Sequence, residues 1–167
     1  MPSTPPFVHL AARTSFSLRD GVIRPRELAV ATAERGMDRV GVADRDGLYG
    51  AVRVAQARAG VGLRPPLLGA DLALAADERR PGWEDRRARR HGRKGPASGA
   101  AWLDDDTARV VLIARTQAGY ADLCRTISDH HLESPRGDPH VTWEQLERRV
   151  GGGGGRADSG VFVLLGD

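Results

Sequence analysis

A histidine and an aspartate near the N-terminus of this chain are residue types that could bind a metal ion. The stretch FVHLAARTSFSLRDG, residues 7–21, is a short apolar run that carries His9 and passes through a Ser/Thr-rich turn to Asp20. Imidazole and carboxylate groups bind divalent metal ions, which activate water for attack on an ester. Ala11 and Arg13 stand where further ligands are expected. The pattern leaves open an active metal site, a variant of one, or its relic.

The other histidines and aspartates also have more ordinary interpretations. The adjacent His130 and His131 could be a metal-binding pair. We expect instead that they lie in the last turn of a helix, where the helix dipole stabilises a positive charge. Asp44 and Asp46 could act together as a carboxylate pair. We expect instead that Asp46 forms a turn after a strand. We expect His9 to be packed or hydrogen-bonded rather than a ligand.

The length and composition predict a globular chain without a membrane segment. The 167 residues, 40% of them hydrophobic, are enough for a core. No run approaches the roughly 20 apolar residues that cross a bilayer, and the N-terminus MPSTPPF lacks the features of a signal peptide. The single Cys124 excludes an internal disulfide framework and fits a reducing compartment. We therefore expect a cytoplasmic protein with no membrane partner.

The hydrophobic pattern predicts an α/β fold. Strands alternate with helices, which favours parallel βαβ units. Pro25 fits the first turn of the first helix, and Gly36 fits its C-terminal cap. Gly60 is expected to end the second helix, and Thr142 with Gln145 predicts a capping box at the last. The expected strands are residues 7–10, 38–44, 65–74, 108–115 and 160–167, and the expected helices are 24–36, 48–59, 116–132 and 142–150.

Residues 77–106 interrupt this pattern with a charged segment. Within it, residues 79–95 hold eight basic and two acidic side chains, a net charge of +6 against +3 for the whole chain. We expect a disordered insertion, with a phosphate-contacting arm as the alternative. Residues 1–6 are expected to be a disordered tail. A last strand buried on both faces needs neighbouring strands, so residues 7–167 are expected to form an incomplete domain.

Three sequence blocks, in this order and spacing, resemble the PHP domain (polymerase and histidinol phosphatase) at the N-terminus of bacterial DNA polymerase III alpha subunits. They are residues 7–21, ERGMDRVGVADRDGLYGAVRVAQARAGV and PPLLGADL. VVLIARTQAGYADLCRTIS resembles the segment that follows in those polymerases, and DHHLESPRGDP with TWEQLE is similar to their error-prone branch. The resemblance implies the N-terminal part of a distorted barrel of βα units, with a disordered basic insertion.

The resemblance also implies where metal ligands would lie in the first motif. The family pattern is His-Leu-His-Val-His-Ser, and its second and third histidines bind metal. These positions correspond to Ala11 and Arg13, so His9 alone remains of the three histidines. The aspartate of the family's Leu-Leu-Asp-Gly pattern corresponds to Asp20.

The later motifs depart from the family pattern as well. Thr-Asp-His corresponds to Ala43, Asp44 and Arg45, so an arginine replaces a histidine ligand. The glutamate of Gly-x-Glu corresponds to Asp71, which is shorter. The histidine that begins the family's His-Leu-x-Leu-Leu-Ala strand falls at about Arg109.

These replacements remove the lone pairs that a metal site requires. A PHP site binds up to three metal ions, whereas alanine has no lone pair and arginine stays protonated without an acceptor. Two like unit charges 4 Å apart cost about 4 kcal/mol at an effective dielectric of about 20. We therefore expect no bound metal and no catalytic residue. We predict instead that Arg13 or Arg45 pairs with Asp20, Asp44 or Asp71, and that Arg45→Ala destabilises the fold.

Three functions remain open on the sequence. The first is a metal-free structural PHP module of an error-prone or translesion DNA polymerase, inactive by itself. Its partners would be the rest of the polymerase chain, DNA, and other replication or translesion proteins. The second is an active phosphoesterase or 3′–5′ exonuclease with a divalent metal cofactor. The third is a basic nucleic-acid-binding module that acts through residues 79–94.

Overall fold

The computed structural model of this chain describes residues 7–18, 20–75, 108–135, 139–150 and 160–165. The expected N-terminal tail and the expected basic insertion lie outside these residues. Within them, no helix combines the length and the apolar character that a membrane crossing requires.

In the described part of the chain, four strands form one open, mixed sheet in the order β1-β2-β3-β4. β1 pairs in parallel with β2, whereas β2 with β3 and β3 with β4 pair antiparallel. The α/β class is confirmed. The expected parallel βαβ arrangement holds for β1, the helix α2 (Ala51–Ala57) and β2, and is wrong for β3 and β4, which pair antiparallel. The strands are β1 (Gly41–Arg45), β2 (Leu67–Ala73), β3 (Arg109–Ala114) and β4 (Val161–Leu165).

The direction of β4 follows from the two helices that precede it. A single helix after a strand carries the chain back to the end of the sheet at which that strand began, so the next strand runs parallel to it. Here two helices, α4 (Gln117–Leu132) and α5 (Trp143–Val150), separate β3 from β4. The chain therefore re-enters from the opposite end, and β4 runs antiparallel to β3.

β4 lies at one edge of the sheet and is largely exposed. Phe162, Val163 and Leu165 are exposed, whereas Val161 is buried. The prediction that this strand is buried on both faces is therefore wrong. The incompleteness of the domain, which rested on that prediction, stays a prediction.

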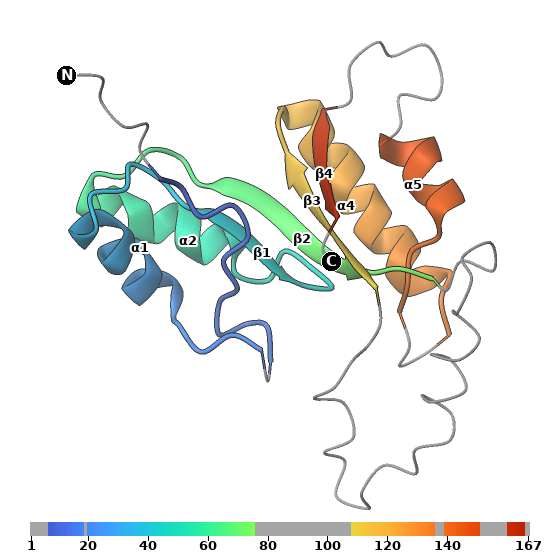
Figure 1. The fold of residues 1–167 in the computed structure, drawn as a ribbon, viewed down its shortest axis with the longest axis horizontal. Helices are drawn as coiled ribbons and strands as arrows, with labels where there is room; N and C mark the ends of the chain where they lie inside the picture. Colours follow the sequence, from blue (N-terminus) through green and yellow to red (C-terminus); the bar gives the residue numbers. More distant parts are fainter. Residues whose placement is uncertain (1–6, 19, 76–107, 136–138, 151–159, 166–167) are drawn as a thin grey trace, which may run out of the picture.

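The helices gather in two groups, each with its own core, at opposite ends of the sheet (Figure 1). One core joins β1 to α1 (Pro25–Glu34) and α2 (Ala51–Ala57), and the other joins β2 and β3 to α4 and α5. The sheet is continuous from one group to the other. The buried residues of the first core are Leu28, Val40, Val42 and Val54, and those of the second include Leu72, Leu112, Leu123 and Leu146.

The helix-end predictions are largely confirmed. α1 begins at Pro25, and Gly36 follows it with a left-handed φ of 69°. In the capping box before α5, the Gln145 N–H donates to Thr142 Oγ1 at 3.1 Å and the Thr142 N–H donates to Gln145 Oε1 at 2.7 Å. The second helix differs, because α2 passes into a 3-10 turn that Gly62 ends, not Gly60.

The expected first strand is an irregular segment beside β1. A single bridge links Ala12 to Val42, and the Gly41 N–H donates to the His9 carbonyl at 2.6 Å. The Ala43 N–H donates to the Ala12 carbonyl at 3.0 Å. These few bonds align the segment with β1 without a full ladder, and they place Arg13 next to the end of β1.

Candidate functional site

Asp44 is a buried carboxylate that organises the N-terminal turn. It lies in β1 and is 1% exposed. It accepts hydrogen bonds from the Thr14 N–H at 2.8 Å, the Thr14 hydroxyl at 2.9 Å and the Ser17 hydroxyl at 2.8 Å. The Gly50 N–H, just before α2, donates to its other oxygen at 2.8 Å. Asp44 thus joins the 14–17 turn, β1 and the start of α2.

Gly50 is glycine because this carboxylate lies against its backbone. A Cβ atom at position 50 would lie 2.4 Å from Asp44 Oδ2 and 2.6 Å from Thr14 Oγ1. The absence of a side chain lets the Gly50 N–H approach Asp44.

Three arginines and three aspartates form one group beside Asp44, which we name the arginine–aspartate cluster. Its members come from the N-terminal segment, the end of β1, β2 and the start of β3. Three guanidinium groups balance three carboxylates in formal charge. Its members are Arg13, Arg45, Arg109, Asp20, Asp46 and Asp71.

Arg109 bridges two carboxylates of this cluster. Its Nε donates to Asp71 Oδ1 at 2.8 Å, and its Nη2 donates to Asp46 Oδ1 and to the Asp71 carbonyl, both at 2.7 Å. The sheet register explains the contact, since Arg109 pairs with Ala73 and Asp71 lies two residues away on the same face. The planar guanidinium can reach both acids at once because its donors point in several directions.

Arg13 and Arg45 complete the cluster from the other side. Arg13 donates to Asp71 and, at 2.6 Å, to Asp20. Arg45 lies farther from its acids, 3.4 Å from Asp20 and 3.7 Å from Asp46. The predicted pairing of these arginines with Asp20 and Asp71 is confirmed.

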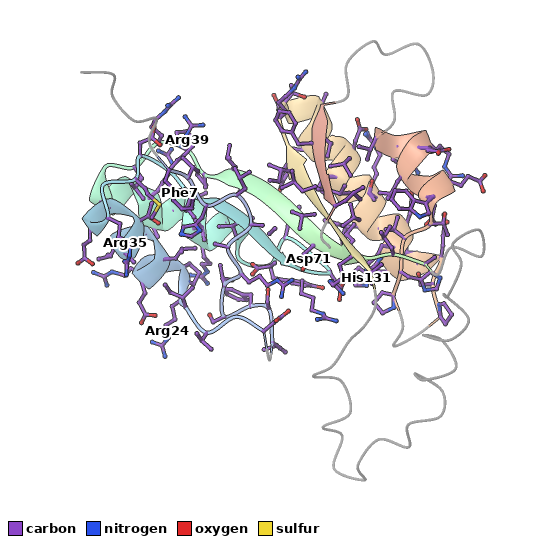
Figure 2. The ribbon with its side chains drawn as sticks, viewed as in Figure 1. Phe7, Arg24, Arg35, Arg39, Asp71 and His131 are labelled. Carbon is purple, nitrogen blue, oxygen red and sulfur yellow. The ribbon has the colours of Figure 1, made fainter. Side chains whose placement is uncertain are left out.

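The end of α4 contacts the same cluster through two histidines. His130 is fully buried, and its Nε2 lies 3.4 Å from Asp46 Oδ1. The His131 Nε2 lies 2.6 Å from the Asp46 carbonyl. Figure 2 labels Asp71 in the sheet and His131 near the end of α4, and Asp46 links the two, since its N–H donates to the Asp71 carbonyl. The last-turn position expected for both histidines is confirmed, and His130 has a contact with the cluster in addition.

Asp46 connects these elements in an unusual backbone conformation. Its φ of 55° is left-handed, which an aspartate tolerates better than most residues. The Asp46 N–H donates to the Asp71 carbonyl at 2.8 Å, so its backbone is tied to β2. Burial alone would raise its pKa, but the facing His130 and the Arg109 guanidinium outweigh this effect and lower it from 3.8 to about 2. The guanidinium at 2.7 Å is the stronger partner, because 3.4 Å is long for a hydrogen bond.

We expect the stability of the fold to depend on the ionisation of Asp46. Because its pKa is about 2 in the folded chain and 3.8 when unperturbed, its contribution is fully present above about pH 4 and is lost as the pH falls toward 2. Asp46→Asn lacks this ionisation. The difference in unfolding free energy between wild type and Asp46→Asn, from urea titrations, should shrink by about 2 kcal/mol over that range. A difference that stays constant with pH would contradict the assignment.

The remaining two positions of the first motif, Ala11 and His9, are not members of this cluster. Ala11 is exposed and has no donor atom, and His9 is exposed with its ring edge-on to Phe7 at 4.8 Å. His9 is therefore packed against a neighbouring ring, as expected, and it is more exposed than a core remnant would be.

Two cluster residues were not placed in the site by the sequence. Asp46 was expected to form a turn, which it does, and His130 was expected to lie in the last turn of a helix, where it also lies. Their contacts depend on the pairing of β1, β2 and β3 and on how α4 packs across them. The available signal was the two carboxylates of ADRDG at the end of a strand, a position where side chains of neighbouring strands meet.

The arrangement does not match the ligand set of a metal centre. Guanidinium donors occupy the positions where histidine acceptors are required, and each carboxylate of the cluster already contacts an arginine. Among the residues that the structure describes, no group of three or more His, Cys, Asp or Glu side chains is placed to hold a metal ion. The geometry therefore favours a cluster that is neutralised by its own arginines.

Comparison with known sequences identifies the proteins that this chain resembles. A model of the PHP domain family matches residues 9–153. The error-prone DNA polymerase of Mycobacterium tuberculosis strain H37Rv is 31% identical over 147 residues, which cover 87% of this chain and 12% of that protein. The DNA polymerase III subunit alpha of Pseudomonas aeruginosa is 35% identical over 130 residues, covering 78% of this chain and 9% of that protein. The chain spans about a tenth of the length of these relatives.

Solved structures show a more distant likeness. A candidate metal-dependent phosphoesterase from Bifidobacterium adolescentis superposes with a TM-score of 0.48 at 19% identity, covering 77% of this chain and 34% of that one. An amidohydrolase from Chromobacterium violaceum gives a TM-score of 0.47 at 18% identity, covering 74% of this chain and 33% of that one.

The sequence match includes every member of the arginine–aspartate cluster and, apart from Val161, the buried residues of both cores. The chain belongs to the PHP domain family and is related to error-prone DNA polymerases and DNA polymerase III alpha subunits.

Proposed function

We propose that this chain is a non-catalytic PHP module of an error-prone DNA polymerase, held together by its arginine–aspartate cluster instead of by metal ions. The observation that carries the proposal is the double pairing of Asp71, which contacts both Arg13 and Arg109. Asp71 is 1% exposed, so its charge requires a partner within the fold. Two arginines supply that partner where a metal-bearing member would use a cation.

The cluster can fulfil the structural part of a metal centre. Divalent ions in proteins join ligands from separate elements and so stabilise the folded state. Arg109 joins β2 and β3 to the turn after β1, and Arg13 joins the N-terminal segment to β2. Neither contact generates a nucleophile, because arginine does not activate water in the manner of a bound metal ion.

The relatives support the wider assignment. Proteins named error-prone DNA polymerase and DNA polymerase III subunit alpha carry a region similar to this chain. In a polymerase of this type, the module would contact the remainder of the chain and support its work on DNA, with other replication or translesion proteins as further partners. By itself it would have neither polymerase nor exonuclease activity.

Metal analysis of the purified chain tests the proposal. We expect less than stoichiometric zinc, manganese and iron by inductively coupled plasma mass spectrometry after expression in metal-supplemented medium. We also expect background hydrolysis of p-nitrophenyl phosphate and of a 3′-labelled oligonucleotide. EDTA should leave the melting temperature unchanged, because the ion pairs do not depend on a chelatable ion.

The alternative, an active phosphoesterase or 3′–5′ exonuclease, predicts the reverse in all three measurements. Stoichiometric metal together with hydrolysis that EDTA abolishes would establish that alternative and overturn the structural proposal. Stoichiometric metal without hydrolysis would also overturn the claim that the arginines replace the metal.

A further inference from the structure

The two helix groups at the ends of the sheet carry different net charges. In the group around α1 and α2, residues 22–66 hold seven arginines and three acids when Asp44 and the arginine–aspartate cluster are left aside, a net charge of +4. In the group around α4 and α5, the described residues of 115–150 hold four arginines and five acids, a net charge of −1. A general excess of arginine in the chain would raise both totals. The positive charge is therefore a property of the first group.

Three arginines of the first group are exposed and form no ion pair with an acid among the described residues. Arg26 lies in α1, Arg35 follows that helix, and Arg53 lies in α2. Arg35 donates to the carbonyl of Ala31 at 3.1 Å, which leaves its charge uncompensated. A guanidinium in this state can hold an anion without first giving up a carboxylate.

The second helix group offers less of this unpaired charge. Two of its four arginines pair with acids of α4, since Arg125 lies 2.9 Å from Asp122 and Arg149 lies 2.9 Å from Asp129. The arginines of the arginine–aspartate cluster are paired as well. An anion at any of these positions competes with a carboxylate, whereas at the three exposed arginines of the first group it does not.

The unpaired arginines belong to two neighbouring helices at one end of the molecule. α1 and α2 contact each other and share a core with β1. Figure 2 labels Arg24, Arg35 and Arg39 around this end, on the side away from α4 and α5. The positive side chains are thus presented on an outer surface, above a common core.

We propose that the outer surface of α1 and α2 binds the phosphate backbone of DNA through Arg26, Arg35 and Arg53. Guanidinium groups form paired, charge-assisted hydrogen bonds with phosphate oxygens. Contacts with phosphates position a protein on DNA without reading its bases, so this binding is independent of base sequence. The inference deepens the proposed function and rests on it, because that function makes DNA the polyanion that the module meets. The surface is separate from residues 79–94.

The test is the fluorescence anisotropy of a labelled DNA duplex, titrated with the full chain at several salt concentrations. Each phosphate contact contributes about 0.9 to the slope of log K against log salt. The triple variant Arg26→Gln/Arg35→Gln/Arg53→Gln should reduce this slope by about 2–3 and weaken binding at low salt at least about tenfold. The single variants Arg26→Gln and Arg53→Gln should each reduce it by about 1.

The matched control is Arg125→Gln/Arg148→Gln/Arg149→Gln, which removes the same charge from the second helix group. It should change the slope by less than about 1, and circular dichroism checks that both triple variants are folded. If the triple variant on α1 and α2 does not fold, the two single variants decide the outcome.

Three results would overturn the inference. The first is a wild type that does not bind the duplex at low salt. The second is a pair of triple variants with equal slopes, which would assign DNA binding to residues 79–94. The third is displacement of the DNA by poly-L-glutamate as effectively as by unlabelled DNA, which would make the partner an acidic polypeptide. None of these results alters metal content, whereas stoichiometric metal in wild type would contradict the proposed function and leave the DNA contact standing.

Discussion

Replacing Asp44 by alanine should lower the free energy of unfolding by about 4 kcal/mol. Asp44 is buried and accepts hydrogen bonds from two backbone N–H groups and two hydroxyls. A buried donor that loses its acceptor costs about 1–3 kcal/mol, and the hydroxyls can rotate toward other partners whereas the backbone groups of Thr14 and Gly50 cannot. The measurement is urea unfolding followed by far-ultraviolet circular dichroism.

Two further variants separate the loss of these hydrogen bonds from a general effect of mutation. Asp44→Asn keeps the shape but replaces one acceptor oxygen by a donor, so we expect a loss of about 2 kcal/mol. Asp38→Ala removes a carboxylate whose partner, Arg64, is exposed, and should cost less than about 1 kcal/mol. A loss at Asp44 no larger than that at Asp38 would contradict its assignment as the organiser of the turn.

Arg109→Ala should cost about 3 kcal/mol of stability in metal-free buffer. Removal of one partner from a buried ion pair leaves an uncompensated charge, with a typical cost of about 3–5 kcal/mol. Arg13 still contacts Asp71, so the value should fall near the lower end of this range. Arg109→Lys keeps the charge but cannot bridge Asp46 and Asp71 with a planar fork, and should lie between wild type and Arg109→Ala.

The sequence predicted that Arg45→Ala destabilises the fold, whereas the structure predicts a larger loss of unfolding free energy for Arg109→Ala. Arg45 is 28% exposed, and so is its acid Asp20, which lies 3.4 Å away. An ion pair this accessible contributes less than about 1 kcal/mol after screening by solvent. We therefore expect Arg45→Ala to behave like Arg64→Ala in thermal unfolding. A loss at Arg45 as large as that at Arg109 would show that the cluster acts as one unit.

Much of the fold could be predicted from local pattern. The helix that starts at Pro25, the capping box of Thr142 and Gln145, and the strands around Val42, Ala70 and Leu112 all follow from residues close in sequence. Strand direction could not be predicted in the same way. It depends on whether one helix or two return the chain, and on contacts between residues far apart in sequence.

For the candidate site, too, one part could be predicted from the sequence and another part could not. The sequence by itself determined which groups are available: three arginines, which cannot donate lone pairs, stand at positions that correspond to histidines in the family pattern, and the carboxylates remain. Charge alone then predicted pairing between them. Only the tertiary structure decided the partners. It brought Arg109 between Asp46 and Asp71 and directed the buried His130 toward Asp46, because strand register and the packing of α4 fix distances that no local pattern encodes.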